Sequence, residues 1–249
     1  MFALIFSYLL SNAFAQDNRS DFSTINGTTL AEGQWSMGVF APLRYGLSED
    51  LEIDIHPGWA FLAPHIGISH ALFKESTWQV TVHHQLGYPT PLLKKLAAPG
   101  IGGVITPDSI IPQIVAFESD MYASQQSELG EITIALGVDV AASIGESNYN
   151  TIDAPYAFQK SNLYQNTLSI NIGMGWEYFA TEKIGYRNFA QTWYTPTSDN
   201  AWVVEDKNSL LFAISDSQQA QIGANVIAGQ YPYGWNWHVL PTMDWIWIF

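Results

Sequence analysis

At residues 168–178 the chain reads LSINIGMGWEY, with large apolar side chains at every second position and Ser, Asn, Gly or Glu between them. A period of two predicts a β-strand, because successive side chains of a strand point to opposite faces. The same alternation recurs in shorter stretches at residues 51–56, 78–83 and 132–140. The second face is small, often glycine and sparsely charged, whereas a soluble sandwich would cover its outer face with Lys and Glu. The pattern therefore favours a transmembrane barrel, whose lipid-facing side chains alternate with a small or polar lumen set.

The length leaves room for one domain, or at most two small ones, and the composition excludes several kinds of function. The 249 residues are 47% hydrophobic and carry 23 acidic against 9 basic side chains, with no cysteine. A net charge of −14 argues against a nucleic-acid partner, which requires clustered Lys and Arg. The absence of Cys removes disulfides, Cys zinc sites, iron–sulfur clusters and Cys nucleophiles. Most of the acidic excess falls in expected turns and loops, in which we include Glu205 and Asp206.

Residues 1–15 predict a secretory signal peptide. They contain a short apolar core followed by Ala13-Phe14-Ala15, which supplies the small residues of a cleavage site, although no basic residue precedes it. Cleavage there leaves 16–249 as the mature chain. The alternative is a buried N-terminal strand or helix of a cytosolic protein. No later stretch approaches the roughly 18 apolar residues of a membrane-spanning helix.

Turn signals divide the mature chain into about twelve strands. Short polar turns alternate with long connections at residues 87–111 and 143–163, as expected for periplasmic turns and external loops. Eleven strands are predicted at residues 34–45, 50–57, 62–73, 77–87, 112–124, 131–142, 164–179, 184–195, 201–215, 219–230 and 236–249. An additional short strand at 22–29 gives the even number of a bacterial barrel, and ten strands is the alternative. The predicted fold is an all-β, antiparallel up-and-down barrel with a narrow lumen.

The C-terminus adds a more specific signal. The last seven residues place Met243, Trp245, Trp247 and the final Phe249 at alternate positions. Here the chain resembles bacterial outer-membrane β-barrel proteins. The resemblance implies that Trp245, Trp247 and Phe249 form the signal read by the barrel-assembly machinery, and that the protein lies in the bacterial outer membrane.

A second resemblance involves residues 30–57. The stretches 30–35 and 42–52, followed by His56-Pro57, are similar to the start of uncharacterised outer-membrane barrels grouped with transporter-like proteins of aromatic-degradation pathways. This resemblance implies a passive pore or an uptake accessory.

Alternation also sorts polar residues onto the lumen face. Arg44 and Glu52 flank the turn at 46–50 symmetrically, so we expect them to face each other, either as a structural salt bridge or as a charge pair along an ion path. The predicted lumen or pore-lining residues are Arg44, Glu52, Asp54, His56, Glu118, Asp120, Asp139, Glu177 and Arg187, and His65, Ser69 and His83 are expected on the same inward face.

Histidines form the most interesting predicted group. His56 and His65 are symmetric about residues 59–62, and we expect His83 near position 67 across the next hairpin. Three converging imidazoles would suit a transition metal or a pH-sensitive gate, and His65 or His83 with Ser69 would suit a hydrolase. Ordinary polar lumen residues are the simpler interpretation. His84 is expected to point outward.

Three functions remain open at this point. The first is a passive pore or transport accessory for small solutes, hydrophobic or aromatic ones included. The second is a hydrolase of lipid or lipopolysaccharide carried by His83 or His65 with Ser69, and the third is a non-conducting structural or adhesive barrel. The expected partners are outer-membrane lipid and lipopolysaccharide, the assembly machinery and small solutes, without a cofactor or a resident metal.

Overall fold

Each strand pairs antiparallel with its neighbours in chain order, and the last strand pairs with the first. The computed structural model describes residues 22–23, 27–75, 77–100, 105–107, 109–152, 154–199, 201–232 and 234–249. Within these ranges twelve strands close into one barrel, which confirms the predicted fold. The strands are β1 (Trp35–Gly38), β2 (Leu43–Ser48), β3 (Leu51–Ile55), β4 (His65–Lys74), β5 (Trp78–Gly87), β6 (Gln113–Ser127), β7 (Gly130–Ile144), β8 (Leu168–Phe179), β9 (Ile184–Tyr194), β10 (Trp202–Ser215), β11 (Gln218–Tyr231) and β12 (Gly234–Ile248).

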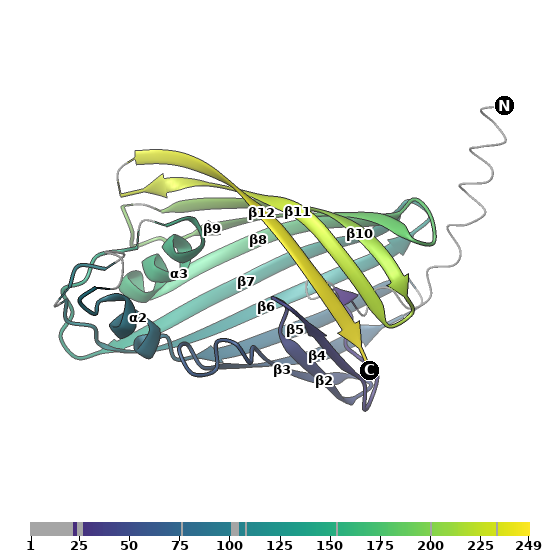
Figure 1. The fold of residues 1–249 in the computed structure, drawn as a ribbon, viewed down its shortest axis with the longest axis horizontal. Helices are drawn as coiled ribbons and strands as arrows, with labels where there is room; N and C mark the ends of the chain where they lie inside the picture. The colour runs from purple at the N-terminus through teal and green to yellow at the C-terminus, as the bar shows by residue number, and fades with distance from the viewer. Residues whose placement is uncertain are drawn as a thin grey trace.

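Two helices lie in the long connections, α2 (Thr90–Leu96) after β5 and α3 (Pro155–Asn166) after β7. Figure 1 shows both helices at one end of the barrel, here called the helix end, and the C-terminus at the other, here called the terminal end. Neither helix is long and apolar enough to cross a membrane. The predicted signal peptide, at residues 1–15, lies outside the described residues.

The twelfth strand does not come from the expected segment. The described residues of 22–29 form no strand, and the predicted strand 34–45 is instead divided into β1 and β2. The backbone turns inward between them, because the N–H groups of Phe40 and Ala41 both donate to the Asp244 carboxylate, at 3.0 and 2.8 Å. A side chain more than 200 residues away in the sequence thus ends β1 after four residues.

The two faces of the sheet differ as alternation predicts. In β8 the apolar Ile170, Ile172 and Met174 are exposed on the outside, while Ser169 and Asn171, at the alternate positions, are buried in the lumen. The same holds for the C-terminal strand, where Met243, Trp245 and Phe249 are exposed outside and Ile246 and Ile248 are buried.

Two predictions include Glu205 and Asp206, and the structure confirms the strand at 201–215 and contradicts the loop. Both belong to β10, where hydrogen bonds compensate their charges. Glu205 is buried in the lumen and accepts a hydrogen bond from Asn225 at 3.0 Å. Asp206 lies on the opposite face, where its oxygens accept bonds from Asn188 at 2.6 Å and Asn208 at 2.9 Å. A strand can therefore carry both residues.

Candidate functional site

An aspartate, a histidine and a serine from three adjacent strands meet on the lumen wall. The Nε2 atom of His83 in β5 lies 2.9 Å from Oδ2 of Asp54 in β3. Ser69 of β4 stands directly opposite His83 in the strand register. Directly paired residues have Cβ atoms roughly 4.5–5.5 Å apart, so the Ser69 and His83 side chains are neighbours on the lumen face. Ser69 is 8% exposed, and its hydroxyl makes no hydrogen bond to any residue that the structure describes.

A glycine makes room for the contact between Asp54 and His83. Gly67 of β4 pairs with Asp54, and a Cβ atom at Gly67 would lie 2.0 Å from Oδ2 of Asp54. Only the absent side chain lets the carboxylate lie across β4 and reach β5. The small residue on the lumen face is therefore part of the site.

A second lumen-facing glycine permits the same kind of contact further around the wall. Asn171 of β8 donates to Asp120 of β6 at 3.0 Å across Gly137 of β7, where a Cβ atom would lie 1.9 Å from the carboxylate. Glycines on the lumen face thus allow side chains of alternate strands to bond directly.

The barrel contains a cavity of about 150 Å³ next to the candidate site. Its wall includes the Asp54, Ser69 and His83 group and the uncharged hydrogen-bond donors Gln85 and Tyr122. Arg44 and Glu52 form another part of the wall, where the guanidinium binds both carboxylate oxygens at 2.7 and 2.8 Å. The predicted contact between Arg44 and Glu52 is therefore present. The remaining lining residues are Thr28, Pro42 and Thr81.

Residues before β1 close the lumen towards the terminal end. The Gly27 N–H donates to Ser124 of β6 at 2.9 Å, and its carbonyl accepts a bond from Thr81 of β5 at 2.5 Å. The Leu30 N–H donates to Glu52 at 2.9 Å, and Leu30 is completely buried. Since Ser124, Thr81 and Glu52 are buried lumen residues, this segment runs inside the barrel.

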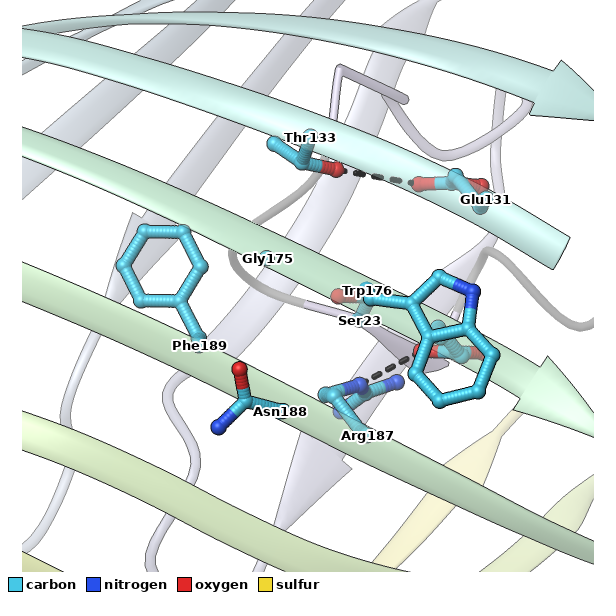
Figure 2. Close-up of a pocket in the computed structure, with 9 residues that line it drawn as sticks. Ser23, Glu131, Thr133, Gly175, Trp176, Arg187, Asn188 and Phe189 are labelled. Atoms are coloured by element: carbon cyan, nitrogen blue, oxygen red, sulfur yellow. Dashed lines mark hydrogen bonds and ion pairs between the residues drawn. The ribbon is translucent and has the colours of Figure 1, made fainter.

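Little space is left beside that segment. Figure 2 shows side chains that line a second cavity, among them Glu131 of β7, Trp176 of β8 and Arg187 of β9. With Ser23 also in its wall, this cavity is only about 10 Å³. That volume holds about one water molecule at most. Arg187 donates to the Glu177 carboxylate at 2.5 Å. The two predicted lumen residues Glu177 and Arg187 therefore form an ion pair within a packed part of the lumen.

Helix α3 occupies the helix end of the lumen. Leu163 on one side packs with Ile114 and Ala141 of β6 and β7, while Phe158 packs with Val203 and Ile227 of β10 and β11. The helix therefore bridges two parts of the barrel wall that lie four strands apart, and it occupies the lumen between them.

Charges fix the side of α3 that faces the lumen. Lys160 pairs with Glu118, and the Gln159 amide donates to Asp139 at 3.4 Å. Burial acts to lower the pKa of Lys160, but the carboxylates of Glu118 and Asp139 raise it above its ordinary value. Lys160 therefore stays protonated, and the predicted pore-lining residues Glu118 and Asp139 hold α3 in place.

Tyr149 lies in the connection between β7 and α3, and its buried hydroxyl has no hydrogen-bond partner among the described residues. We therefore expect Tyr149→Phe to stabilise this connection by about 1 kcal/mol. Burial raises the pKa of Tyr149 to about 12. Between pH 10 and 12 the Tyr149 hydroxyl is therefore protonated in the native state and ionised in the unfolded chain, so the free energy of unfolding falls as pH rises through that window. In Tyr149→Phe this pH-dependent loss of stability is absent. Hydrogen exchange of α3 measures both effects. In the control Tyr88→Phe, which removes a bond from the hydroxyl to Gln113, no stabilisation is expected.

The three histidines do not converge as predicted. His56 and His65 lie close, with ring centroids 6.4 Å apart, but each ring bonds to a backbone carbonyl, of Phe40 and Ala63 respectively. His83 lies opposite Ser69 rather than position 67, because the hairpin turns later than expected and β4 contains a bulge between Ala71 and Phe73. No group of three or more metal-ligating side chains occurs in the described ranges.

The pairing of His83 with Asp54, and the donors Gln85, Tyr122 and Lys160, were not predicted. The available sequence signal was a lumen-facing glycine opposite a carboxylate, namely Gly67 opposite Asp54. His84 points outward as expected and stacks on Phe117 with ring centroids 5.6 Å apart.

Comparison with known proteins gives a likeness of fold. The chain is similar to LpxR from Salmonella typhimurium, with 11% sequence identity, a TM-score of 0.43, and coverage of 88% of this chain and 90% of LpxR. Neither the family models nor the curated proteins that were searched match the sequence. The predicted similarity to barrels of aromatic-degradation pathways stays a prediction.

Proposed function

We propose that this protein is a bacterial outer-membrane hydrolase that cleaves ester bonds of membrane lipids at Ser69, His83 and Asp54. The observation that carries the proposal is a serine hydroxyl without a structural partner, opposite an imidazole that is held by a carboxylate, on the wall of an internal cavity. These are the residue types and roles of nucleophile, general base and orienting acid.

The membrane location is supported by the outer surface. Apolar side chains are exposed over β4 to β8, and the sheet is closed between β12 and β1. Exposed apolar strands in a closed sheet suit hydrocarbon, where backbone groups need partners within the protein. We assign the short turns and the C-terminus to the periplasm and the helix end to the exterior.

The chemistry follows from the contacts of His83. Its Nε2–H donates to Asp54, which leaves Nδ1 as the base for Ser69. Transfer of the Ser69 proton to Nδ1 lets Oγ attack the ester carbonyl, and the imidazolium then protonates the departing alcohol. Water attacks the acyl-serine in the same way, and the fatty acid leaves while Ser69 regains its proton. Asp54 stabilises the imidazolium, and Gln85 or Tyr122 is available to donate to the oxyanion.

The occupied lumen disfavours a general passive pore. The segment around Gly27 fills one end and α3 crosses the other. An open barrel of this size would already be narrow. With both ends occupied, we expect small solutes to find no continuous aqueous path.

The full chain, refolded in detergent and checked by its heat-dependent shift on a gel, tests the proposal. We expect it to release fatty acid from diacyl phosphatidylethanolamine in mixed micelles and to give no discrete current steps in a planar bilayer. Current steps without hydrolysis would support the pore instead. Folded protein that neither conducts nor hydrolyses any of a range of lipid esters would leave the structural or adhesive barrel.

A further inference from the structure

Most of β12 has a neighbour on one side only. It pairs with β11 along its whole length, from Gly234 to Trp247. Its pairs with β1 begin only at Ile246, and one more bond joins Val39 to the Trp245 carbonyl. On that side, residues 234–244 pair with no strand in the described part of the chain. We call this stretch the free edge, and Figure 1 shows it (yellow) standing apart from β2 and β3.

Two short segments, 39–42 and 56–64, here called the rim, border the opening on its other side. The rim meets the free edge at Asp244, whose carboxylate binds the N–H groups of Phe40 and Ala41. The two segments of the rim are joined by the hydrogen bond of 2.9 Å between His56 and the Phe40 carbonyl. The rim exposes Phe40, Trp59 and Phe61, of which Phe61 is 91% exposed, and the free edge exposes Trp235, Trp237 and Met243. The wall is thus interrupted in its helix-end half, between two sets of apolar side chains.

The opening adjoins the candidate site. Pro42 belongs to the rim and also lines the cavity that contains Ser69 and His83. The segment that contains Gly27 occupies the terminal end of the lumen and α3 occupies the helix end, so the interrupted side wall offers a more direct route to this cavity.

Unpaired backbone groups are unfavourable in hydrocarbon, so a polar ligand that binds the free edge would stabilise the barrel in a membrane. An added β-strand would satisfy the edge, but Pro241 lies in its middle and lacks the N–H that a ladder needs. Ester, amide and hydroxyl groups near a lipid headgroup can form hydrogen bonds with individual backbone N–H and C=O groups, without the continuous ladder that a paired strand requires.

We propose that a lipid of the surrounding outer leaflet enters sideways between the free edge and the rim, with an acyl chain in the opening and its ester at Ser69. This inference rests on the proposed function for its substrate and on the strand pairing for its route. The substrate class is therefore a membrane-resident acyl lipid and excludes a water-soluble ester as the natural substrate.

The test uses phosphatidylethanolamine with a diazirine on one acyl chain, in vesicles of phosphatidylethanolamine and phosphatidylglycerol that contain the full chain. After illumination, peptide mass spectrometry locates the label. We expect labelling of the inward-facing His238 and Leu240 as well as the outward-facing Val239 and Met243. In Thr242→Trp, which fills the lumen side of the opening, the inward label is lost and the outward label stays.

The control Ile222→Trp places the same indole side chain on the outer face of β11, next to Met243 in the register, and leaves both labels unchanged. Retained outward label shows that each variant is folded and inserted. Label confined to outward residues in the unmodified protein, or a dimer joined through the free edge, overturns lateral entry. Ser69→Ala is expected to show the same labelling of inward and outward residues as the unmodified chain. Labelling of inward residues without hydrolysis would therefore overturn only the proposed function. Hydrolysis without labelling of inward residues would overturn only the lateral route.

Discussion

Replacing Ser69 by Ala is expected to lower kcat/KM for lipid esters at least about a thousandfold, because the acyl group then has no nucleophile to bind. His83→Gln should cause a loss of similar size, since the glutamine cannot accept the proton. Asp54→Asn should cost about 10²- to 10⁴-fold, because an amide can hold the imidazole but does not stabilise its charged form. Fatty-acid release from mixed micelles measures all three. The double variant of Ser69 and His83 should be little worse than either single variant, because the residues act as a unit.

The sheet supplies a matched control for these variants. His84 and Ser119 are the same two residue types, paired in register on the neighbouring strands β5 and β6, but they lie on the outer face. Ser119→Ala and His84→Gln should therefore leave hydrolysis unchanged. Equal losses from the inner and outer pairs would show that activity reports only barrel stability. A Ser69→Ala variant that keeps full activity would reject the serine mechanism.

The face of each strand could be predicted from the sequence because alternation depends only on the pleat of a strand. That is why Arg44, Asp54 and Asp139 were correctly placed inward, and His84 outward. The number of strands needed more, since β1 ends where Asp244 binds the turning backbone, a contact between distant parts of the chain. Local pattern contains no information about such a contact.

Register was the main reason why the site itself was only partly predicted. A bulge in β4 moved His83 opposite Ser69, and Gly67 let Asp54 reach His83 across an intervening strand. Bulges depend on the twist and closure of the whole sheet. The occupants of the lumen were missed for a related reason, because Gly27 and Lys160 belong to segments outside the strands, where alternation predicts nothing.

One signal for the opening was present in the sequence but was not used. Pro241 interrupts the C-terminal strand, and proline is confined to edge strands or bulges because it cannot donate to a ladder. A closed barrel has no edge unless its wall is interrupted, so Pro241 within the last strand already indicated that β12 is incompletely paired.

Arg44→Met is expected to reduce the free energy of unfolding by about 3–5 kcal/mol, because it leaves the Glu52 carboxylate buried without its charge partner. The side chains of Arg44 and Glu52 are only 5% and 3% exposed. Arg44 also donates to the Ser23 carbonyl, and Glu52 accepts from the Leu30 N–H, both at 2.9 Å, so the pair holds the segment inside the terminal end. Urea unfolding in lipid vesicles, followed by the heat-dependent gel shift, measures the loss.

The surface pair of Lys74 and Asp50 provides the comparison. Lys74 Nζ lies 3.3 Å from Asp50 Oδ1, but the side chains of Lys74 and Asp50 are 33% and 62% exposed. Lys74→Met should therefore change the free energy of unfolding by no more than about 1 kcal/mol. The double variant Arg44→Met with Glu52→Leu should recover part of the loss, because no unpaired charge remains in the lumen. If Arg44→Met is no more destabilising than Lys74→Met, the terminal end must be hydrated rather than packed. The segment around Gly27 would then not close the lumen, and the passive pore would again be the simpler function for this barrel.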